Sequence, residues 1–180
     1  LAEKYPKTTE LDLSFNSIKT LTNISGFSEL QHLVVDNNML VSDQDFPKLE
    51  NLHTLCVNGN EIDDLDIFLD SAEANFPKLA YLSMLKNPAC PNFFVGKQDE
   101  DYLRYRYKVI YKIPRLKFLD SSKVTEAERK EAQRVGHLLK VARPDPTQYA
   151  RQSTAKDDGI KELPPSTRKI GETKSSMGIT

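Results

Sequence analysis

The sequence predicts a right-handed α/β solenoid in which short parallel strands line a concave face, followed by a helical C-terminal cap and a disordered tail. Three observations support this fold class. A leucine-containing segment recurs four times, a helical pattern follows the repeats, and the last 37 of the 180 residues carry few apolar side chains. We therefore expect repeats over residues 1–100, a cap over 101–143 and a tail over 144–180.

The repeated segments follow the pattern L-x-x-L-x-L-x-x-N-x-L with conservative exchanges. They start at Thr8, Leu30, Leu52 and Leu79, which lie 22, 22 and 27 residues apart. Positions 4 and 6 are apolar, as expected for a short strand that turns alternate side chains into a core. Position 9 is always asparagine, and these side chains are expected to form a buried hydrogen-bonded ladder between coils. The ladder residues are Asn16, Asn38, Asn60 and Asn87. This is the leucine-rich repeat pattern.

A diverged fifth unit and a first cap helix are expected after the four repeats. The segment Ile113–Asp120 repeats the leucine spacing. Before it, residues Asp101–Tyr111 place Leu103, Tyr107 and Ile110 at helical spacing. A solenoid needs its last apolar face covered, so this region is expected to close the C-terminal end.

A second cap helix is expected to begin at Thr125, because Thr125 and Glu128 form a capping-box pattern. Its apolar stripe consists of Ala132, Val135, Leu139 and Ala142. Pro144 is expected to end the helical pattern. At the other end of the chain, Leu1–Lys7 looks like the end of an earlier repeat, so the N-terminus is expected either to be truncated or to begin inside the solenoid.

The 22-residue repeats resemble the short, intracellular leucine-rich repeat class, and the stretch Tyr105–Arg129 resembles the cap of the spliceosomal U2 A-prime protein and its relatives. Over residues 1–143, repeats and cap together look most like a branch of this group that acts in pigment-cell differentiation. That resemblance implies a cytoplasmic, non-enzymatic adaptor that binds a Rab-type small GTPase and is recruited to endosomes or melanosomes. The alternative is a ribonucleoprotein subunit that binds an RNA-binding protein, as the spliceosomal relative implies.

Positions 3, 5 and 7 of each repeat are expected on the concave side, where they would contact a partner. The candidate contact residues are Glu10, Asp12, His32, Val34, Asp36, Asn58, Tyr81, Leu85 and Phe118. Ser83 and Asp120 occupy position 5 and are likewise expected to point outward. This face is acidic at its N-terminal end and apolar or aromatic elsewhere, which suits a protein partner. The alternative is that these residues are only the exposed side of short strands.

The composition disfavours two classes of partner. Lys and Arg number 25 against 26 Asp and Glu, a net charge of −1, so no nucleic-acid binding is expected. No apolar run approaches the roughly 18 residues of a membrane span, so no membrane insertion is expected. The sequence opens on Leu1 without the basic-then-apolar pattern of a signal peptide, which leaves open a signal in an upstream piece. The two cysteines, Cys56 and Cys90, are too few for a disulfide scaffold, which favours a reducing compartment.

Tyrosines and basic residues alternate in the first cap helix. The tyrosines are Tyr102, Tyr105, Tyr107 and Tyr111, and the basic residues are Arg104, Arg106, Lys108 and Lys112. This pattern is compatible with base stacking and phosphate contacts. We favour a cap helix that buries one tyrosine face against the last repeat and leaves the basic residues in water.

No catalytic or metal-binding motif emerges from the sequence, so no enzyme activity, cofactor or metal is expected. Asp63, Asp64, Asp66 and Asp70 lack the glycine and closing glutamate of a calcium loop and are interpreted as a solvated connection. Cys56 is expected to point outward and to be open to oxidation, without a base that would activate it.

The tail contains two candidate docking motifs for a second protein partner. The candidate residues are Ile160, Leu163, Met177 and Ile179, in a polar and flexible context. The alternative is a passive disordered end.

Overall fold

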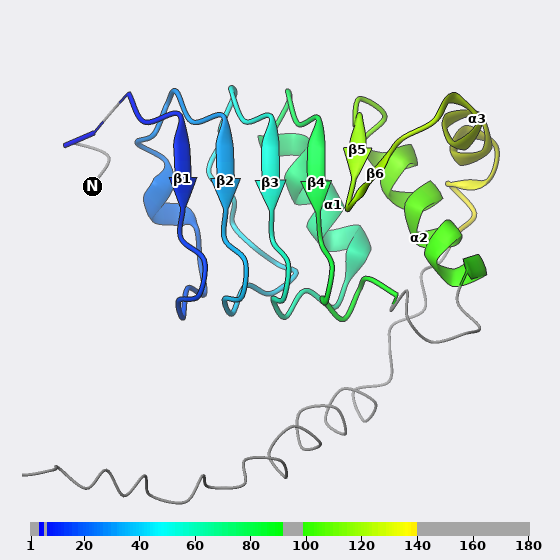
Figure 1. The fold of residues 1–180 in the computed structure, drawn as a ribbon, viewed down its shortest axis with the longest axis horizontal. Coiled ribbons are helices and arrows are strands. Elements are labelled where there is room, and N and C mark those ends of the chain that lie inside the picture. The colour runs from blue at the N-terminus through cyan, green and yellow to red at the C-terminus, as the bar shows by residue number, and fades with distance from the viewer. Residues whose placement is uncertain (1–3, 6, 92–98, 140–180) are drawn as a thin grey trace, which may run out of the picture. The chain divides into compact units, whose positions relative to one another are not determined.

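In this computed structural model of the 180-residue chain, the described residues are 4–5, 7–91 and 99–139. Within them, six strands form one sheet in sequence order, and Figure 1 shows them side by side. β1 to β5 pair in parallel, and β6 pairs antiparallel with β5. The strands are β1 Glu10–Asp12, β2 His32–Val34, β3 Thr54–Cys56, β4 Tyr81–Ser83, β5 Phe118–Leu119 and β6 Ser122–Lys123. The predicted α/β repeat solenoid is confirmed.

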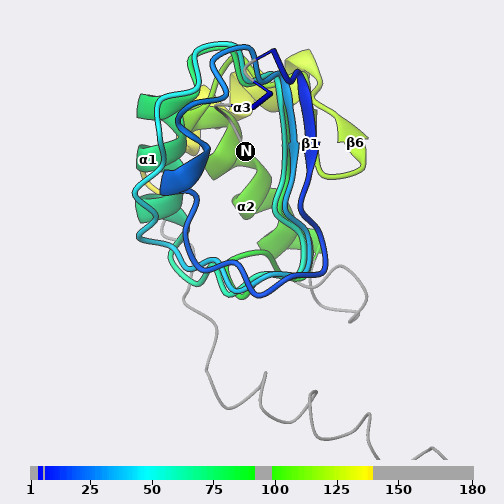
Figure 2. The ribbon, with the colours of Figure 1, turned by 90° about the vertical axis from the view of Figure 1, so that its left-hand side faces the viewer.

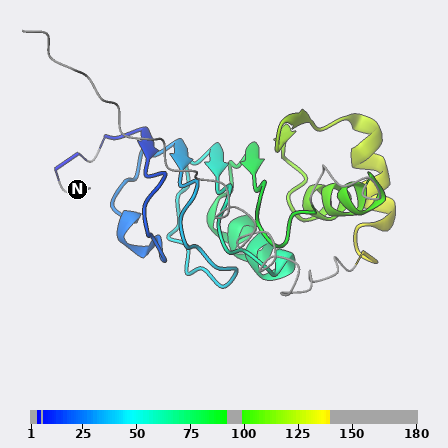
Figure 3. The same ribbon diagram turned by 60° about the horizontal axis from the view of Figure 1, so that its bottom comes forward.

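The wall opposite the sheet carries the 3-10 helix η1, Thr22–Ile24, and the helix α1, Leu65–Asn75. Figure 2, viewed along the stack, shows the strands on one side of a flattened coil and α1 on the other, and Figure 3 shows the same separation. Where the sequence predicts only a solvated connection, the structure contains the helix α1. Asp64 caps this helix by accepting a hydrogen bond from the Ile67 N–H at 3.2 Å.

The core runs between the two walls. The register aligns one leucine from each of the five parallel strands. Four of these, Leu33, Leu55, Leu82 and Leu119, are fully buried. Leu11, on the first strand, is only half-buried, because β1 has a neighbouring coil on one side only among the described residues.

The asparagines of position 9 form bonds that repeat from coil to coil. Asn38 accepts from the Ile18 N–H at 3.0 Å and donates to the Leu13 carbonyl at 3.0 Å, both in the preceding coil. Asn60 and Asn87 repeat this arrangement on the next coils and are buried. Asn16 differs from the expectation of burial: it is exposed, and among the described residues its amide donates to carbonyls of its own coil.

Two helices close the C-terminal end of the described solenoid: α2, Asp99–Lys112, and α3, Glu126–Val135. α2 buries Tyr105, Val109 and Ile110, whereas Leu103, which was expected on the buried face, is exposed. The helix begins before the boundary drawn at residue 101, and the domain limits stay predictions.

The capping box of the second cap helix is confirmed: Thr125 and Glu128 hydrogen-bond each other's backbone N–H. The expected stripe is shorter than predicted, because α3 ends at Val135 and Leu139 lies beyond the helix. Ala142 lies outside the described residues.

Among the described residues, no helix is both long enough and apolar enough to cross a membrane. Residues 140–180 lie outside the described residues, and so do the tail docking candidates Ile160, Leu163, Met177 and Ile179. The disordered tail and its docking motifs therefore stay predictions.

Candidate functional site

Position 3 of the repeats forms a straight row across the outer side of the sheet. Glu10, His32, Thr54, Tyr81 and Phe118 are direct partners in neighbouring strands. His32 Nδ1 and Thr54 Oγ1 share a hydrogen bond of 3.0 Å. The rings of Tyr81 and Phe118 lie 6.2 Å apart, and Phe118 is 43% exposed. We call this row, together with the position-5 row beside it, the strand face. Its β4–β5 end presents an aromatic pair.

The position-5 row consists of Asp12, Val34, Cys56 and Ser83, aligned by the same register. Asp12 is exposed, and bonds from the Ser14 hydroxyl and backbone N–H lower the pKa of its carboxyl. Val34 is half-buried. Ser83 is buried, which contradicts its expected outward position. The side chains of the position-5 row are therefore accessible to a partner mainly at the β1 end.

Cys56 is half-buried in the middle of the strand face. Burial, assisted by the negative charges of Asp36 and Asp12, raises the pKa of its thiol to about 11. The reactive form of cysteine is the thiolate, which is scarce at neutral pH under these conditions. The structure does not support the expectation that Cys56 is readily oxidised.

The position-7 candidates form a second hydrogen-bonded ladder at the rim where the strands end. Asp36 accepts from the Asn58 backbone N–H at 2.8 Å and from its side-chain amide at 3.0 Å. Asn58 in turn accepts from the Ser83 hydroxyl at 2.7 Å and from the Leu85 N–H at 2.8 Å. These side chains hold neighbouring coils together, so they present fewer free acceptors to a partner than the sequence implied. The recurrence of short polar residues at position 7 is the signal that would have found this ladder.

Asp120 was expected to point outward and is instead 1% exposed. It lies in the left-handed region, with φ 54°, at the turn between β5 and β6. Its carboxyl accepts from the Met84 N–H at 2.9 Å and from the Tyr102 hydroxyl at 3.0 Å. Burial raises the pKa of Asp120. The residue joins the cap to β4 and is not part of the strand face.

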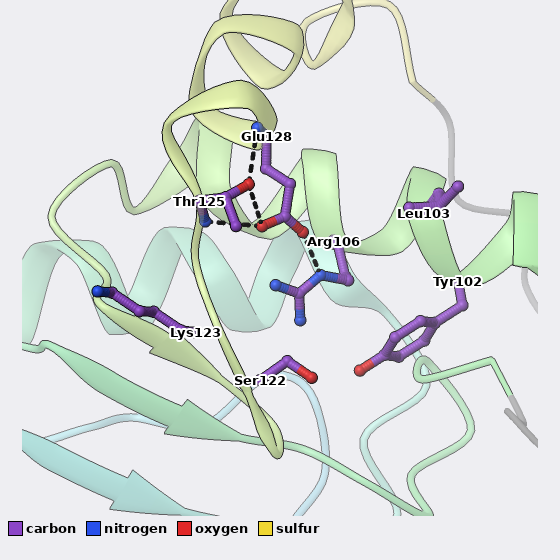
Figure 4. A pocket seen from close by; sticks show the side chains of 7 residues that line it. All are labelled: Tyr102, Leu103, Arg106, Ser122, Lys123, Thr125 and Glu128. Carbon is purple, nitrogen blue, oxygen red and sulfur yellow. Dashed lines mark hydrogen bonds and ion pairs between the residues drawn. The ribbon is translucent and has the colours of Figure 1, made fainter.

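A pocket of about 500 Å³ lies between the cap helices and β6 (Figure 4). Its lining residues are Tyr102, Leu103, Arg106, Ser122, Lys123, Thr125 and Glu128. Arg106 Nε lies 2.7 Å from Glu128 Oε1, and its Nη1 donates to the Leu119 carbonyl at 3.1 Å. Burial opposes ionisation of Glu128, but the bonds from Arg106 and Thr125 outweigh it and lower the pKa of Glu128. The charged pair of this pocket thus connects α2 with the first turn of α3.

The basic residues of α2 are mostly engaged by carboxylates. Lys108 Nζ lies 2.8 Å from Asp66, Lys112 pairs with Asp70, and Arg104 lies 3.8 Å from Asp101. Arg106 and Lys108 are also buried, contrary to the expectation that they stay in water. Tyr105 is fully buried. These contacts fit a cap helix better than a helix that stacks bases and neutralises phosphates.

Among the described residues, no group of three or more His, Cys, Asp or Glu side chains is placed to hold a metal ion.

Comparison with known proteins fits this geometry. A family model described as leucine-rich repeat matches residues 6–143. The chain belongs to the leucine-rich repeat family. In this leucine-rich repeat chain, 128 residues are 48% identical to the human leucine-rich melanocyte differentiation-associated protein, covering 70% of the chain and 65% of that relative.

Relatives of a second kind also match. The U2 small nuclear ribonucleoprotein A' of Candida albicans is 35% identical over 126 residues, covering 68% of the leucine-rich repeat chain and 48% of that protein. The human U2 A' protein is 33% identical over 130 residues, covering 69% and 45%. The chain thus spans about two thirds of the melanocyte relative and about half of the U2 A' proteins.

A solved structure shares the fold. The Drosophila melanogaster SNF/U2A' complex contains a chain that matches with a TM-score of 0.61 at 23% identity, covering 86% of this chain and 79% of that one.

Proposed function

We propose that the chain is a non-enzymatic adaptor that binds a protein partner on the strand face, and that this partner is a small GTPase of the Rab class. The adaptor links the GTPase to endosomal and melanosome trafficking machinery during melanocyte differentiation. It acts in the cytoplasm with recruitment to endosomes or melanosomes, and its tail, residues 144–180, contacts a second protein.

The observation that carries the interaction surface is the aromatic pair of half-buried Tyr81 and exposed Phe118, on a sheet whose coils are cross-linked by side-chain ladders. Aromatic side chains on a rigid support bind with little loss of conformational entropy and dominate many protein interfaces. The similarity to the human melanocyte protein supports the role in differentiation. The Rab class and the trafficking link rest on the resemblance to that branch of the family.

The test is a pull-down of purified Rab proteins, each loaded with GDP or a non-hydrolysable GTP analogue, by the immobilised chain. We expect retention of at least one Rab in one nucleotide state only. The double variant Tyr81→Ala/Phe118→Ala should weaken that binding about 30-fold, the effect of losing one strong anchor of about 2 kcal/mol. Leu138→Ala is the matched control, because Leu138 is exposed apolar surface in the turn after α3.

Two outcomes would count against this proposal separately. Equal retention of every Rab in both nucleotide states contradicts the GTPase assignment. Nucleotide-dependent binding that the aromatic double variant leaves unchanged contradicts the use of the strand face.

The alternative function is a ribonucleoprotein subunit that binds an RNA-binding protein. Identities of 33–36% to U2 A' proteins over about 70% of the chain favour it. It predicts nuclear localisation and co-purification with an RNA-binding protein. Imaging of the tagged chain in pigment cells separates the two functions: vesicular or cytosolic signal favours the adaptor, and nuclear speckles favour the ribonucleoprotein subunit.

A further inference from the structure

The position-3 row extends across the sixth strand and changes charge along its length. Lys123 of β6 pairs directly with Phe118 of β5. Directly opposed residues of paired strands point to the same face, so Lys123, which also borders the cap pocket, lies at the edge of the strand face beside the aromatic pair. The row therefore starts at Glu10, passes Tyr81 and Phe118, and ends at Lys123. With strands about 4.8 Å apart, it measures roughly 24 Å.

The two ends of this row carry charges that the described residues leave unpaired. Glu10 and Lys123 are exposed, and neither makes an ion pair with another described residue. Asp12 adds a second negative charge at the β1 end, where its lowered pKa keeps it ionised. Exposed charges of opposite sign at the ends of one row orient a partner more than they tighten its binding.

The middle of the row offers different contacts. The hydrogen bond between His32 and Thr54 satisfies one polar atom of each residue within the protein. The aromatic pair lies next to Lys123 and several strands away from Glu10, so the row is asymmetric: its apolar anchor site is adjacent to its basic end.

We propose that this row receives one segment of a partner polypeptide in a defined direction. The segment places a basic side chain at Glu10 and Asp12, apolar side chains on Tyr81 and Phe118, and an acidic side chain at Lys123. An extended chain advances about 3.3 Å per residue, so about seven residues separate the basic and acidic groups. This inference rests on the proposed use of the strand face and adds the order of charge and apolar groups in the partner.

The test uses two synthetic peptides of identical composition. Peptide A carries two arginines, a Gly/Ser spacer of five residues, two leucines and two glutamates, in that order. Peptide B has the arginines and glutamates exchanged, so its leucines adjoin the basic end. Binding of fluorescein-labelled peptides to the full chain is measured by anisotropy at low and high salt. Because the apolar group is off-centre, peptide B cannot satisfy the row by binding in the opposite direction.

We expect wild-type protein to prefer peptide A about tenfold at low salt. Peptide B loses the attractions at both ends of the row if it binds in one direction, and the contact of its leucines with Tyr81 and Phe118 if it binds in the other. The preference should shrink in 0.5 M salt, where the Debye length is only a few ångströms. The double variant Glu10→Lys/Lys123→Glu should reverse the preference. Glu29→Lys/Lys130→Glu, which exchanges exposed charges away from the row, should keep it.

Absence of binding by peptide A, equal affinity for both peptides, or an unchanged preference in the Glu10/Lys123 variant would each overturn the proposed direction. A dimer in which a second copy occupies the strand face would overturn it as well. Sedimentation of the chain alone at the same concentrations tests for such a dimer. If Rab binding requires Tyr81 and Phe118 but the protein shows no preference between the two peptides, this inference is wrong and the proposed function stands.

Discussion

Asparagine at position 9 has different partners depending on whether the described residues include a preceding coil. The Asn60 amide donates to carbonyls of its own and the preceding coil, Val57 and Val35, and its oxygen accepts from the Leu40 N–H. Asn16 holds the same place in the pattern but reaches only its own coil. The residue type therefore predicts the ladder, whereas the cross-coil bond depends on a neighbour that the residue itself does not supply.

Replacing Asn60 with alanine should lower the free energy of unfolding by about 3 kcal/mol, because it leaves the buried Leu40 N–H and Val35 carbonyl without this partner. Asn16→Ala is the matched control and should cost about 1 kcal/mol or less, since Asn16 is exposed. Urea denaturation of the three proteins measures both values. Equal losses in the two variants would show that the ladder adds nothing beyond a local turn.

At the scale of elements, the cap is attached to the solenoid by contacts between segments far apart in sequence. Lys108 of α2 bonds Asp66 of α1 and also the Leu139 carbonyl after α3. Arg115 donates to the carbonyl of Phe76, which follows α1, at 2.7 Å. The longer spacing before the fourth repeat therefore provides a helix that binds the cap.

Gly136, the residue after α3, lies tightly against Tyr111 of α2. A Cβ atom there would lie 2.4 Å from Tyr111 Cβ and 2.5 Å from the Ala132 carbonyl oxygen. Gly136→Ala should therefore lower the free energy of unfolding by about 1–3 kcal/mol, the usual cost of overpacking. The direction of this change distinguishes a crowded position from an open one, because a glycine-to-alanine replacement at an unhindered helical position raises the free energy of unfolding by about 0.4–1 kcal/mol. Thermal unfolding followed by circular dichroism measures it, and a rise in stability would contradict the close approach.

At the scale of the whole molecule, stability in acid reflects carboxyls whose pKa values shift in opposite directions. The pKa of Glu128 is lowered from its ordinary 4.5, so its contribution to stability is present above that value and is lost as pH falls through the folded-state pKa. The pKa of Asp120 is raised from its ordinary 3.8, so its contribution is present below that value and is lost as pH rises. As the pH falls, the stability gained by protonation of Asp120 offsets part of the stability lost by protonation of Glu128.

Glu128→Gln should lower the free energy of unfolding at pH 7 by about 3 kcal/mol, because Arg106 then stays buried without its ion-pair partner. It should also flatten the decline of stability below about pH 4.5. Asp120→Asn should steepen that decline instead. Urea denaturation between pH 3 and pH 7 gives both profiles, and parallel profiles for wild type and Glu128→Gln would contradict the assigned role of the pair.

The repeat register, the core leucines, the turn asparagines and the capping box at Thr125 follow from the amino-acid sequence alone. These features are local: each depends on side-chain alternation or on residues three apart, and the repeat shows them several times. The same periodicity predicted which positions lie in the rows of the strand face, so Tyr81 and Phe118 were recognised before any contact was known.

Which of those candidate side chains remain free to contact a partner depends on packing in the folded protein. Asp120 and Ser83 are buried, and Asp36 and Asn58 bond across coils, because packing brings their neighbours within hydrogen-bonding distance. Lys108 and Asp66 lie 42 residues apart, and no local pattern relates them. Whether a charged side chain has an ion-pair partner depends on contacts between segments that lie far apart in the sequence. The polarity of the row from Glu10 to Lys123 therefore became visible only in three dimensions.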